Sequence, residues 1–320
     1  MIRLLRAGHP EFDAVDVSAP GWKLPAVTVW IDLVDPTRTE ELAVEKALGV
    51  LLPTREEMAE IEVSSRLYQE DGATYMTAML LHKSGGDIPA SDPLTFVLVG
   101  ERLVTIRYFE PKSFPIFESQ LQRQPELCAT GVSTFVNLLE AVVDRTADNL
   151  EFTSAEVETI SNEIFASKKP SNYEPILNRL GINQTANNKV RDSLVSLSRL
   201  IGFAIFADQI EASEHAREHL DSMQRDIQSL TDHSSYLSGN ITFLLDAALG
   251  LINIEQNSII KIFSIVTVAI MPPTLVGAIY GMNFEHMPEL HWAIGYPLAI
   301  LLMVVSGIAP LVWFKRKGWF

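Results

Sequence analysis

The hydrophobic pattern of the chain is strongest near its C-terminus, where two long apolar stretches cover about residues 259–280 and 292–314. At 1.5 Å per residue, a helix of about 22 residues is ~33 Å long, and the hydrocarbon core of a bilayer is ~30 Å thick. Each stretch is therefore long enough to span a membrane. The segment between them is too short to form a domain, so the pattern predicts a helical hairpin with both chain ends on one side of the bilayer.

The first 130 residues alternate between strand and helix patterns. Thr54 and Glu57 stand at capping-box spacing, which marks the start of a helix. Alternating apolar segments flank the turn residues 70–72 and 100–101, a pattern typical of β-hairpins. We therefore predict a compact mixed sheet with helices packed on it. The predicted strands are 27–34, 66–68, 73–83, 94–99 and 103–108, and the predicted helices are 39–48 and 54–62.

From Gly131 onward, glycine and proline become sparse and apolar residues recur at steps of three and four, which predicts long helices. The first helix ends at a break in residues 168–174, and the second ends at about Phe206. The third begins near Asp208 and contains no proline before Pro272, so we predict one helix of roughly 60 residues that enters the membrane. Such a rod can transmit a conformational change to the membrane.

One face of the first apolar stretch is small and polar. Its residues recur at steps of three and four, which places them along one side of a helix. In membranes, such a face either packs against another helix or lines a pore. The second use requires a ring of subunits in which this helix is innermost. The pattern leaves both possibilities open, and Pro272-Pro273 adds a predicted kink. The face consists of Asn257, Ile260, Ser264, Thr267, Met271, Thr274 and Ala278, and it continues to Gly281.

Charge is distributed unevenly along the chain. Residues 257–320 contain four basic and two acidic residues, so residues 1–256 hold the remaining 21 basic and 38 acidic residues, a net charge of −17. This sign argues against nucleic-acid binding and favours cations. The tail 315–320 is basic, whereas the loop between the apolar stretches contains Glu285 and Glu289 and no basic residue. The positive-inside tendency therefore predicts cytoplasmic termini and an external loop.

The loop carries a recognisable motif. Gly281-Met282-Asn283 directly ends the first apolar stretch, and Met287-Pro288-Glu289-Leu290 follows it. Here the sequence resembles the CorA family of magnesium channels, and most closely its enterobacterial type. The likeness extends to residues 252–257, 260–264 and 272–275 and, near the N-terminus, to 29–36, so it covers essentially the whole chain.

The resemblance implies a funnel-shaped homopentamer in a bacterial inner membrane, with a cytoplasmic α/β/α domain and a pore lined by the first span. Gly281, Met282 and Asn283 would form the outer mouth, and Asn257, Met271 and Thr274 match positions that line the family's pore. The implied segments are a cytoplasmic α/β domain (1–130), a helical region with the stalk helix (131–256), a pore helix (257–281), a periplasmic loop (282–291), a second span (292–314) and a cytoplasmic tail (315–320).

The resemblance also implies the transported and regulatory ions. It implies transport of Mg²⁺ and Co²⁺, with Ni²⁺ as a further candidate, and it implies that Mg²⁺ bound between carboxylates of adjacent subunits holds the channel closed. Asp221 and Asp226 are candidates for those carboxylates, and no organic cofactor is expected. Because Mg²⁺ dehydrates reluctantly, a ring of Asn283 amide oxygens suits the hydrated ion. Glu285 and Glu289 would concentrate cations at the mouth, unless they are ordinary solvated loop acids.

Two other protein classes remain as alternatives. A zinc transporter of the related ZntB branch is the closer one, but that branch usually lacks methionine at the middle loop position and the Met-Pro-Glu-Leu stretch. A membrane-tethered enzyme is disfavoured because the chain has no nucleotide loop, nucleophile elbow or paired metal-ligand motif. His286 and His291 have no partner at zinc-ligand spacing. The single cysteine, Cys128, cannot form an internal disulfide, and we predict a buried structural thiol.

Overall fold

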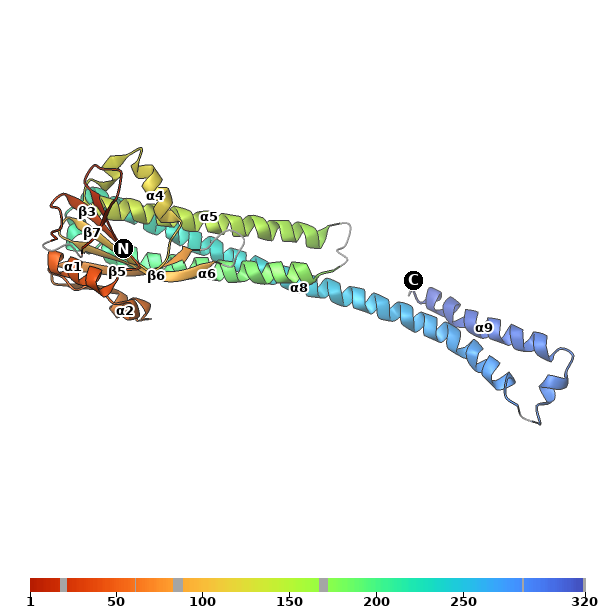
Figure 1. Ribbon diagram of the computed structural model, residues 1–320. Helices are drawn as coiled ribbons and strands as arrows, with labels where there is room; N and C mark the ends of the chain where they lie inside the picture. Colours follow the sequence, from red (N-terminus) through yellow and green to blue (C-terminus); the bar gives the residue numbers. More distant parts are fainter. Residues whose placement is uncertain (18–21, 61, 83–88, 167–171, 284, 319–320) are drawn as a thin grey trace. The chain divides into compact units, whose positions relative to one another are not determined.

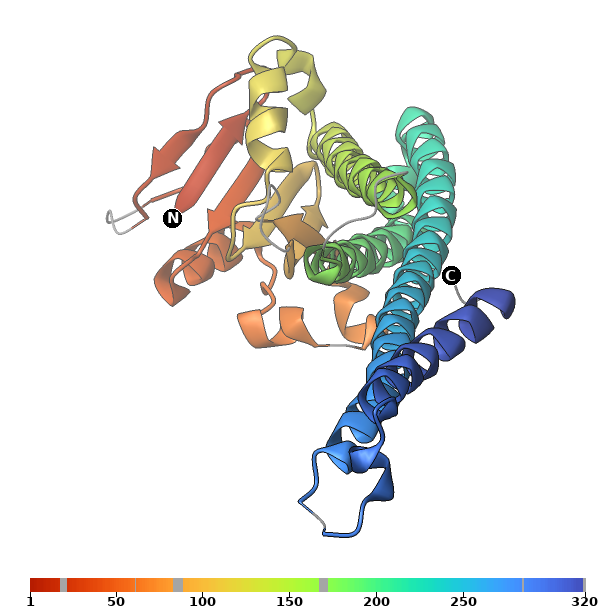
Figure 2. The same ribbon diagram turned by 90° about the vertical axis from the view of Figure 1, so that its right-hand side faces the viewer.

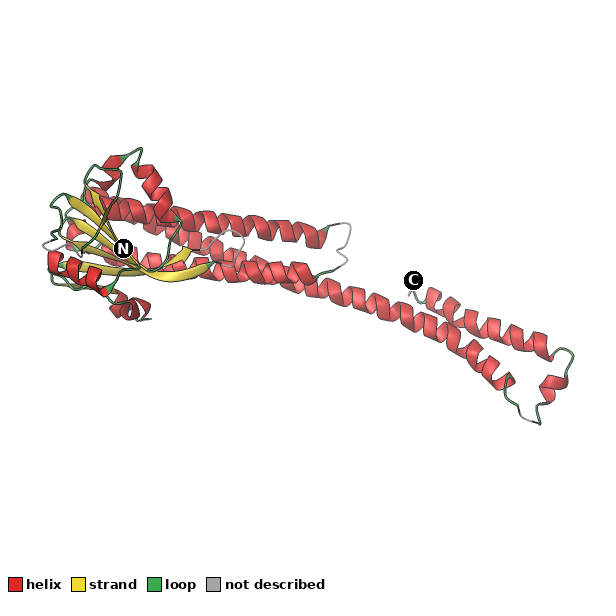
Figure 3. Ribbon diagram, viewed as in Figure 1, coloured by secondary structure: helices red, strands yellow, loops and turns green. Residues whose placement is uncertain are grey.

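A computed structural model describes residues 1–17, 22–60, 62–82, 89–166, 172–283 and 285–318 of the chain (Figure 1). The chain forms two compact units, Met1–Leu245 and Asp246–Phe320. All strands among the described residues precede residue 108, and the following part is helical (Figure 3). Lys83, Phe284 and most of the predicted break at 168–174 lie outside the described residues.

The first unit contains a seven-stranded mixed sheet with the order β2-β1-β3-β7-β6-β5-β4. Only β3 and β7 pair in parallel, and the other neighbours are antiparallel. The mixed sheet and both hairpins are confirmed, whereas β1 and β2 were not predicted. The strands are β1 (Ile2–Arg6), β2 (Asp13–Val15), β3 (Thr28–Val34), β4 (Leu67–Glu70), β5 (Ala73–His82), β6 (Ala90–Val99) and β7 (Arg102–Arg107).

Short helices precede the β4–β5 hairpin: α1 (Arg38–Leu48), α2 (Arg55–Ala59) and α3 (Val63–Arg66). Thr54 and Glu57 form the predicted capping box of α2. The predicted end of this helix at residue 62 was wrong, because α2 ends at Ala59 and the backbone of Glu60 is extended, with ψ at 143°.

Successive residues of the central strands point to opposite faces of the sheet, as the strand pleat requires. Ile31 and Leu33 of β3 pack in one buried cluster with Val44 of α1 and Met58 of α2. On the other face, Trp30 contacts the aromatic rings of α4 (Ser113–Leu121), and Phe96 contacts Phe135 of α5. Helices therefore cover both faces, which confirms the α/β/α arrangement (Figure 2).

A short 3-10 turn, η1 (Pro125–Cys128), leads into the long helices α5 (Gly131–Phe165) and α6 (Glu174–Ala204). A single helical turn, α7 (Asp208–Glu211), precedes α8 (Glu214–Tyr280), which has 67 residues. The prediction of one helix from Asp208 was wrong at its start. The Ser213 hydroxyl accepts a hydrogen bond from the Ala216 N–H, so the chain begins a new helix there.

Polar contacts fix the register of α8 on α6 within the first unit, where these helices run side by side (Figures 1 and 2). The Asn187 amide donates to the Ser234 carbonyl at 2.9 Å, and the Ser234 hydroxyl donates back to Asn187 Oδ1 at 3.0 Å. Both side chains are fully buried. Because buried polar groups are costly when unpaired, this pair disfavours a shift of α8 along α6.

The second unit is a helical hairpin formed by the end of α8 and by α9 (Gly295–Arg316), with a 3-10 turn, η2 (Pro288–His291), in its loop. Both helices are long and apolar enough to cross a membrane. The predicted start of the second helix at Trp292 was wrong by three residues, because the Trp292 N–H bonds the Glu289 carbonyl in the η2 turn. Helix α8 continues as an α-helix through Pro272 and Pro273.

Candidate ion pathway

The turn after α8 positions the three residues predicted to form the outer mouth. The Gly281 N–H still bonds the Gly277 carbonyl at 3.0 Å, and the Met282 N–H bonds the Ile279 carbonyl at 3.2 Å. A Cβ atom on Gly281 would lie only 3.0 Å from the Gly277 carbonyl oxygen, so glycine permits this tight exit from the helix. Asn283 follows, exposed, and its amide makes no hydrogen bond to another described residue. It is therefore available to a ligand in solvent.

The rest of the loop folds onto the start of α9. Glu285 is exposed and Glu289 is half-buried. A Cβ atom on Gly295 would lie 2.2 Å from the Glu289 carbonyl oxygen, which is too close for any side chain. Gly295 thus lets the η2 turn seat on α9, and the sequence pattern gave no signal for this role beyond a glycine near a helix start.

The small polar face of α8 lies away from α9. The seven residues from Asn257 to Ala278 that define this face are all exposed. Helix α9 packs elsewhere: a Cβ on Gly307 would lie 3.2 Å from Pro273 Cγ, and one on Gly277 would lie 3.4 Å from Met303 Cε. At 100° per residue, the half-buried positions of α8 centre about 180° from the small polar face. The hairpin's own packing therefore does not use that face.

The threonines on this face have defined hydrogen-bond roles. The Thr267 hydroxyl donates to the Phe263 carbonyl at 2.8 Å, and the Thr274 hydroxyl donates to the Ile270 carbonyl at 2.8 Å. Since each hydroxyl has one hydrogen, its remaining lone pairs can only accept. The face therefore offers acceptors to donors outside the helix, such as the water shell of a cation.

The two candidate regulatory carboxylates have different surroundings. The charge of Asp226 of α8 acts on Asp144 of α5, as do the charges of Glu140 and Asp148. Glu140 contacts His219 at 3.0 Å, and Asp148 pairs with Arg145 at 3.1 Å. Partial burial, and then the charges of Glu140, Asp148 and Asp226, raise the pKa of Asp144 above its ordinary value. Asp221 and Asp226 are both exposed, and neither forms an ion pair with another described residue. Within the described part of one chain, no three His, Cys, Asp or Glu side chains are arranged to hold a metal ion.

An α/β domain whose last helix continues into a hairpin of two helices long and apolar enough to cross a membrane has the architecture expected of a membrane protein with C-terminal spans. A family model described as CorA-like Mg²⁺ transporter protein matches residues 25–316. The chain thus belongs to the CorA-like Mg²⁺ transporter family, whose members are transporters and not enzymes.

The chain is similar to relatives in both sequence and fold. It is 36% identical over 296 residues to the magnesium transport protein CorA of Yersinia pseudotuberculosis, covering 92% of each chain. The complete structure of the CorA magnesium transporter from Methanocaldococcus jannaschii matches with a TM-score of 0.80 at 20% identity, covering 100% of this chain and 99% of that one. The ZntB cytoplasmic domain from Vibrio parahaemolyticus matches with a TM-score of 0.59 at 10% identity, covering 79% of this chain and 98% of that one.

Proposed function

We propose that the protein is a channel for Mg²⁺ uptake across a bacterial inner membrane, with both termini in the cytoplasm. Five copies form a ring in which the small polar face of α8 lines the pore and α9 lies outside it. The observation that carries this proposal is the exposure of that face opposite α9. In a membrane, exposed polar groups need a partner or water, and a central pore supplies water.

The outer mouth selects the ion by its water shell. Five Asn283 side chains present amide oxygens that accept hydrogen bonds from the coordinated waters of Mg²⁺, which holds its octahedral shell tightly. Glu285 and Glu289 add a negative field that raises the local concentration of divalent cations. Deeper in the pore, Thr267, Thr274 and the other residues of the small polar face accept further hydrogen bonds. Hydrated Co²⁺ and Ni²⁺ are close enough in size to follow the same path.

Cytoplasmic Mg²⁺ closes the channel. Carboxylates of neighbouring subunits, among them Asp226 and Asp221, bind the ion in the closed ring, so binding stabilises that state by mass action. Partial burial, and then repulsion from Glu140, Asp148 and Asp226, raise the pKa of Asp144. The repulsive part supports this assignment, because a cation at this surface relieves it. When cellular Mg²⁺ falls, the negative charges repel each other and α8 carries the change into the membrane.

The loop assignment is tested with Asn283→Ala in vesicles that contain the purified full-length protein. We expect Mg²⁺ uptake, followed with an internal Mg²⁺ dye, to be lost, because the alanine ring offers no side-chain acceptor. His286→Ala, an exposed change in the same loop, is the matched control and should retain uptake. Light scattering should give the same assembly mass for all three proteins. Undiminished uptake by the Asn283→Ala protein would sink the assignment.

A second flux measurement distinguishes a magnesium channel from a zinc transporter. Uptake of Mg²⁺, Co²⁺, Ni²⁺ and Zn²⁺ is compared with and without an imposed pH gradient. We expect Mg²⁺ flux that does not require the gradient. Proton-driven zinc uptake with little Mg²⁺ flux would place the protein with the zinc transporters instead.

A further inference from the structure

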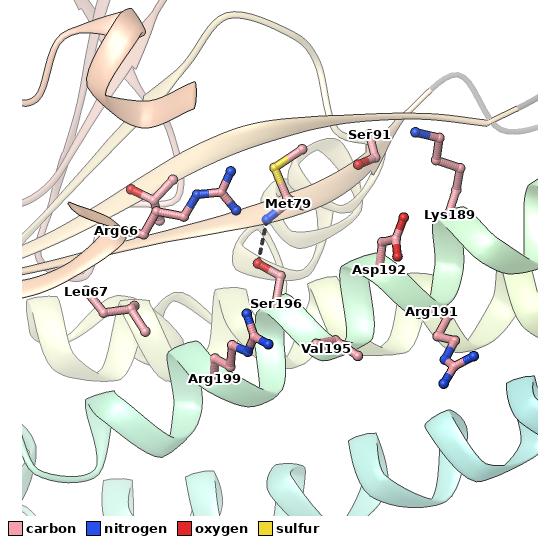
Figure 4. A pocket seen from close by; sticks show the side chains of 11 residues that line it. Arg66, Leu67, Met79, Ser91, Lys189, Arg191, Asp192, Val195, Ser196 and Arg199 are labelled. Carbon is pink, nitrogen blue, oxygen red and sulfur yellow. Dashed lines mark hydrogen bonds between the residues drawn. The ribbon is translucent and has the colours of Figure 1, made fainter. Parts of the chain in front are cut away.

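A cavity of about 420 Å³ lies in the first unit between α6 and the β4–β5 end of the sheet (Figure 4). Its charge is unusual for this protein, whose net charge is −15. Four basic side chains line the cavity, and the only acidic one is Asp192. The lining residues include Arg66 at the end of α3, Leu67 at the start of β4, and Lys189, Arg191, Asp192 and Arg199 of α6.

The basic side chains of the cavity are not neutralised within the described chain. Six other arginines form ion pairs with carboxylates, as Arg179 does with Glu163 at 2.7 Å. In contrast, Arg66, Arg199 and Lys189 form no ion pair with any described residue. Arg66 donates its Nε–H to the Glu60 carbonyl, which leaves its terminal nitrogens available. Burial, and then the charge of Arg199, lower the pKa of Arg66.

The geometry concentrates this charge at one end of the cavity. The guanidinium groups of Arg66 and Arg199 approach the space beside Ser196 from opposite elements (Figure 4). Lys189 and Asp192 lie further along α6, whereas the guanidinium of Arg191 turns away. Two cations brought together without a carboxylate repel each other, so an anion placed between them is stabilised.

The wall of the cavity is held in place by α6. The Ser196 hydroxyl accepts from the Met79 N–H at 3.0 Å, and the Ser193 hydroxyl donates to the Met79 carbonyl at 2.7 Å. Pro93, which lies opposite Met79 in the ladder, has no N–H to donate. These contacts join α6 to β5 and leave the hydrogen of the Ser196 hydroxyl free to donate toward the cavity.

We propose that this cavity binds an anion that bears phosphate groups, with one phosphate between Arg66 and Arg199. Guanidinium groups match phosphate oxygens in pairs, and Ser196 adds a neutral donor. The volume is within the range of small-molecule sites. Lys189 extends the positive charge along α6, which favours a ligand with more than one phosphate. The site is separate from the ion pathway and does not depend on the proposed channel function.

Calorimetry on the full-length protein tests the proposal, with inorganic phosphate and tripolyphosphate as probes in Mg²⁺-free buffer. We expect both to bind, tripolyphosphate more tightly. Arg66→Gln and Arg199→Gln should each weaken binding about tenfold or more, as expected for the loss of a charge-assisted hydrogen bond. Arg191→Gln, which removes the same charge from the lining residue that turns away, should weaken it much less. Asp192→Asn should strengthen binding because it removes the one repelling carboxylate.

Two further measurements follow. The first asks whether the phosphate belongs to a soluble ligand or to a lipid headgroup, and the second asks whether these basic side chains serve subunit assembly instead. Tripolyphosphate is titrated into protein in phosphatidylcholine nanodiscs and in phosphatidylglycerol nanodiscs. Equal affinity for tripolyphosphate in both kinds of nanodisc indicates a soluble ligand. Weaker tripolyphosphate binding in phosphatidylglycerol nanodiscs than in phosphatidylcholine nanodiscs indicates that the lipid headgroup competes for the site. Light scattering gives the assembly mass of each variant. The proposal is overturned if neither probe binds, if Arg191→Gln weakens binding as much as Arg66→Gln, or if the substitutions change assembly and leave binding unaltered.

Discussion

At the scale of single residues, buried charge in the sheet is paired within a closely packed set of side chains. Arg107 donates to Asp32 Oδ2 at 2.9 Å and to Oδ1 at 3.1 Å, and both side chains have no exposed surface. Thr105 donates to Asp32 Oδ1 at 2.8 Å and accepts from the Trp30 indole at 2.9 Å. Because both charges are out of water, the loss of either leaves the other buried without its main partner.

Asp32→Ala should therefore lower the free energy of unfolding by about 3–5 kcal/mol, since Arg107 would stay buried without its main partner. Glu110→Gln is the matched control. It removes the other carboxylate that contacts Arg107, but that carboxylate is 57% exposed. Exposed ion pairs contribute about 0–1 kcal/mol, so the control should change little. Chemical denaturation followed by the fluorescence of tryptophan measures both. An equal decrease in the free energy of unfolding for both variants would mean that burial does not determine how strongly these ion pairs stabilise the fold.

The raised pKa of Asp144 leads to a prediction about the pH dependence of stability. Because this pKa is higher in the folded than in the unfolded protein, ionisation of Asp144 lowers the free energy of unfolding, and the loss develops as pH rises through the raised pKa. Asp144→Asn should increase stability at pH 7, and the increase should vanish below about pH 4, where the wild-type carboxyl is also neutral. Thermal unfolding across this pH range measures the difference. Glu151→Gln, on an exposed position of the same helix, should show no comparable gain.

At the scale of helices and strands, the sequence predicted the long elements better than the short ones. Helices α5, α6 and α8 carry sustained three- and four-residue periods, which local sequence expresses directly. Strands β1 and β2 were missed because they are short, at five and three residues, although Gly8 in the turn between them has a positive φ of 70°. Helix α4 was missed because it contains Pro115. The first turn of a helix tolerates proline, because N–H groups at these positions have no partner within the helix and the missing N–H of proline costs nothing there.

Glycine contacts in the hairpin could not be predicted either, because they exist only once two helices meet. Pro273 lacks an N–H, so it leaves the Ala269 carbonyl without its usual helical partner. A Cβ on Gly307 would lie 3.3 Å from that carbonyl oxygen. The close approach of α9 therefore occurs at the point where the proline weakens α8.

Gly307→Val should consequently loosen the hairpin, because its branched side chain must displace Pro273 or the Ala269 carbonyl. Gly250→Val is the matched control, since a Cβ at Gly250 of α8 meets no atom within 4 Å. The fraction of detergent-solubilised protein that stays monodisperse after heating should fall for the first variant. It should stay unchanged or rise slightly for the second, because valine is the better helix former. A loss of similar size in both would show that the contact at Gly307 is unimportant.

At the scale of the whole molecule, part of the candidate pathway is visible in the sequence and part is not. The three- and four-residue periodicity identified the face from Asn257 to Ala278, but it did not decide whether this face packs against another helix or lines a pore. The contacts of Gly277 and Gly307 show that α9 occupies another face, and this required the three-dimensional packing. A pore and a shared metal site both need further copies of the chain, and the residues of one subunit specify neither completely.

The effect of Mg²⁺ on stability tests the proposed regulatory site between subunits. A ligand that binds only the folded, closed assembly stabilises it by about 2.7 kcal/mol at a concentration 100 times its Kd. Mg²⁺ should therefore raise the unfolding temperature of the full-length protein in detergent. The double change Asp221→Asn and Asp226→Asn should reduce this rise, because it removes two candidate carboxylates, whereas Glu151→Gln should not. Na⁺ at equal ionic strength controls for screening. If Na⁺ gave the same rise, or if the double variant responded like wild type, Mg²⁺ would not be binding at these carboxylates.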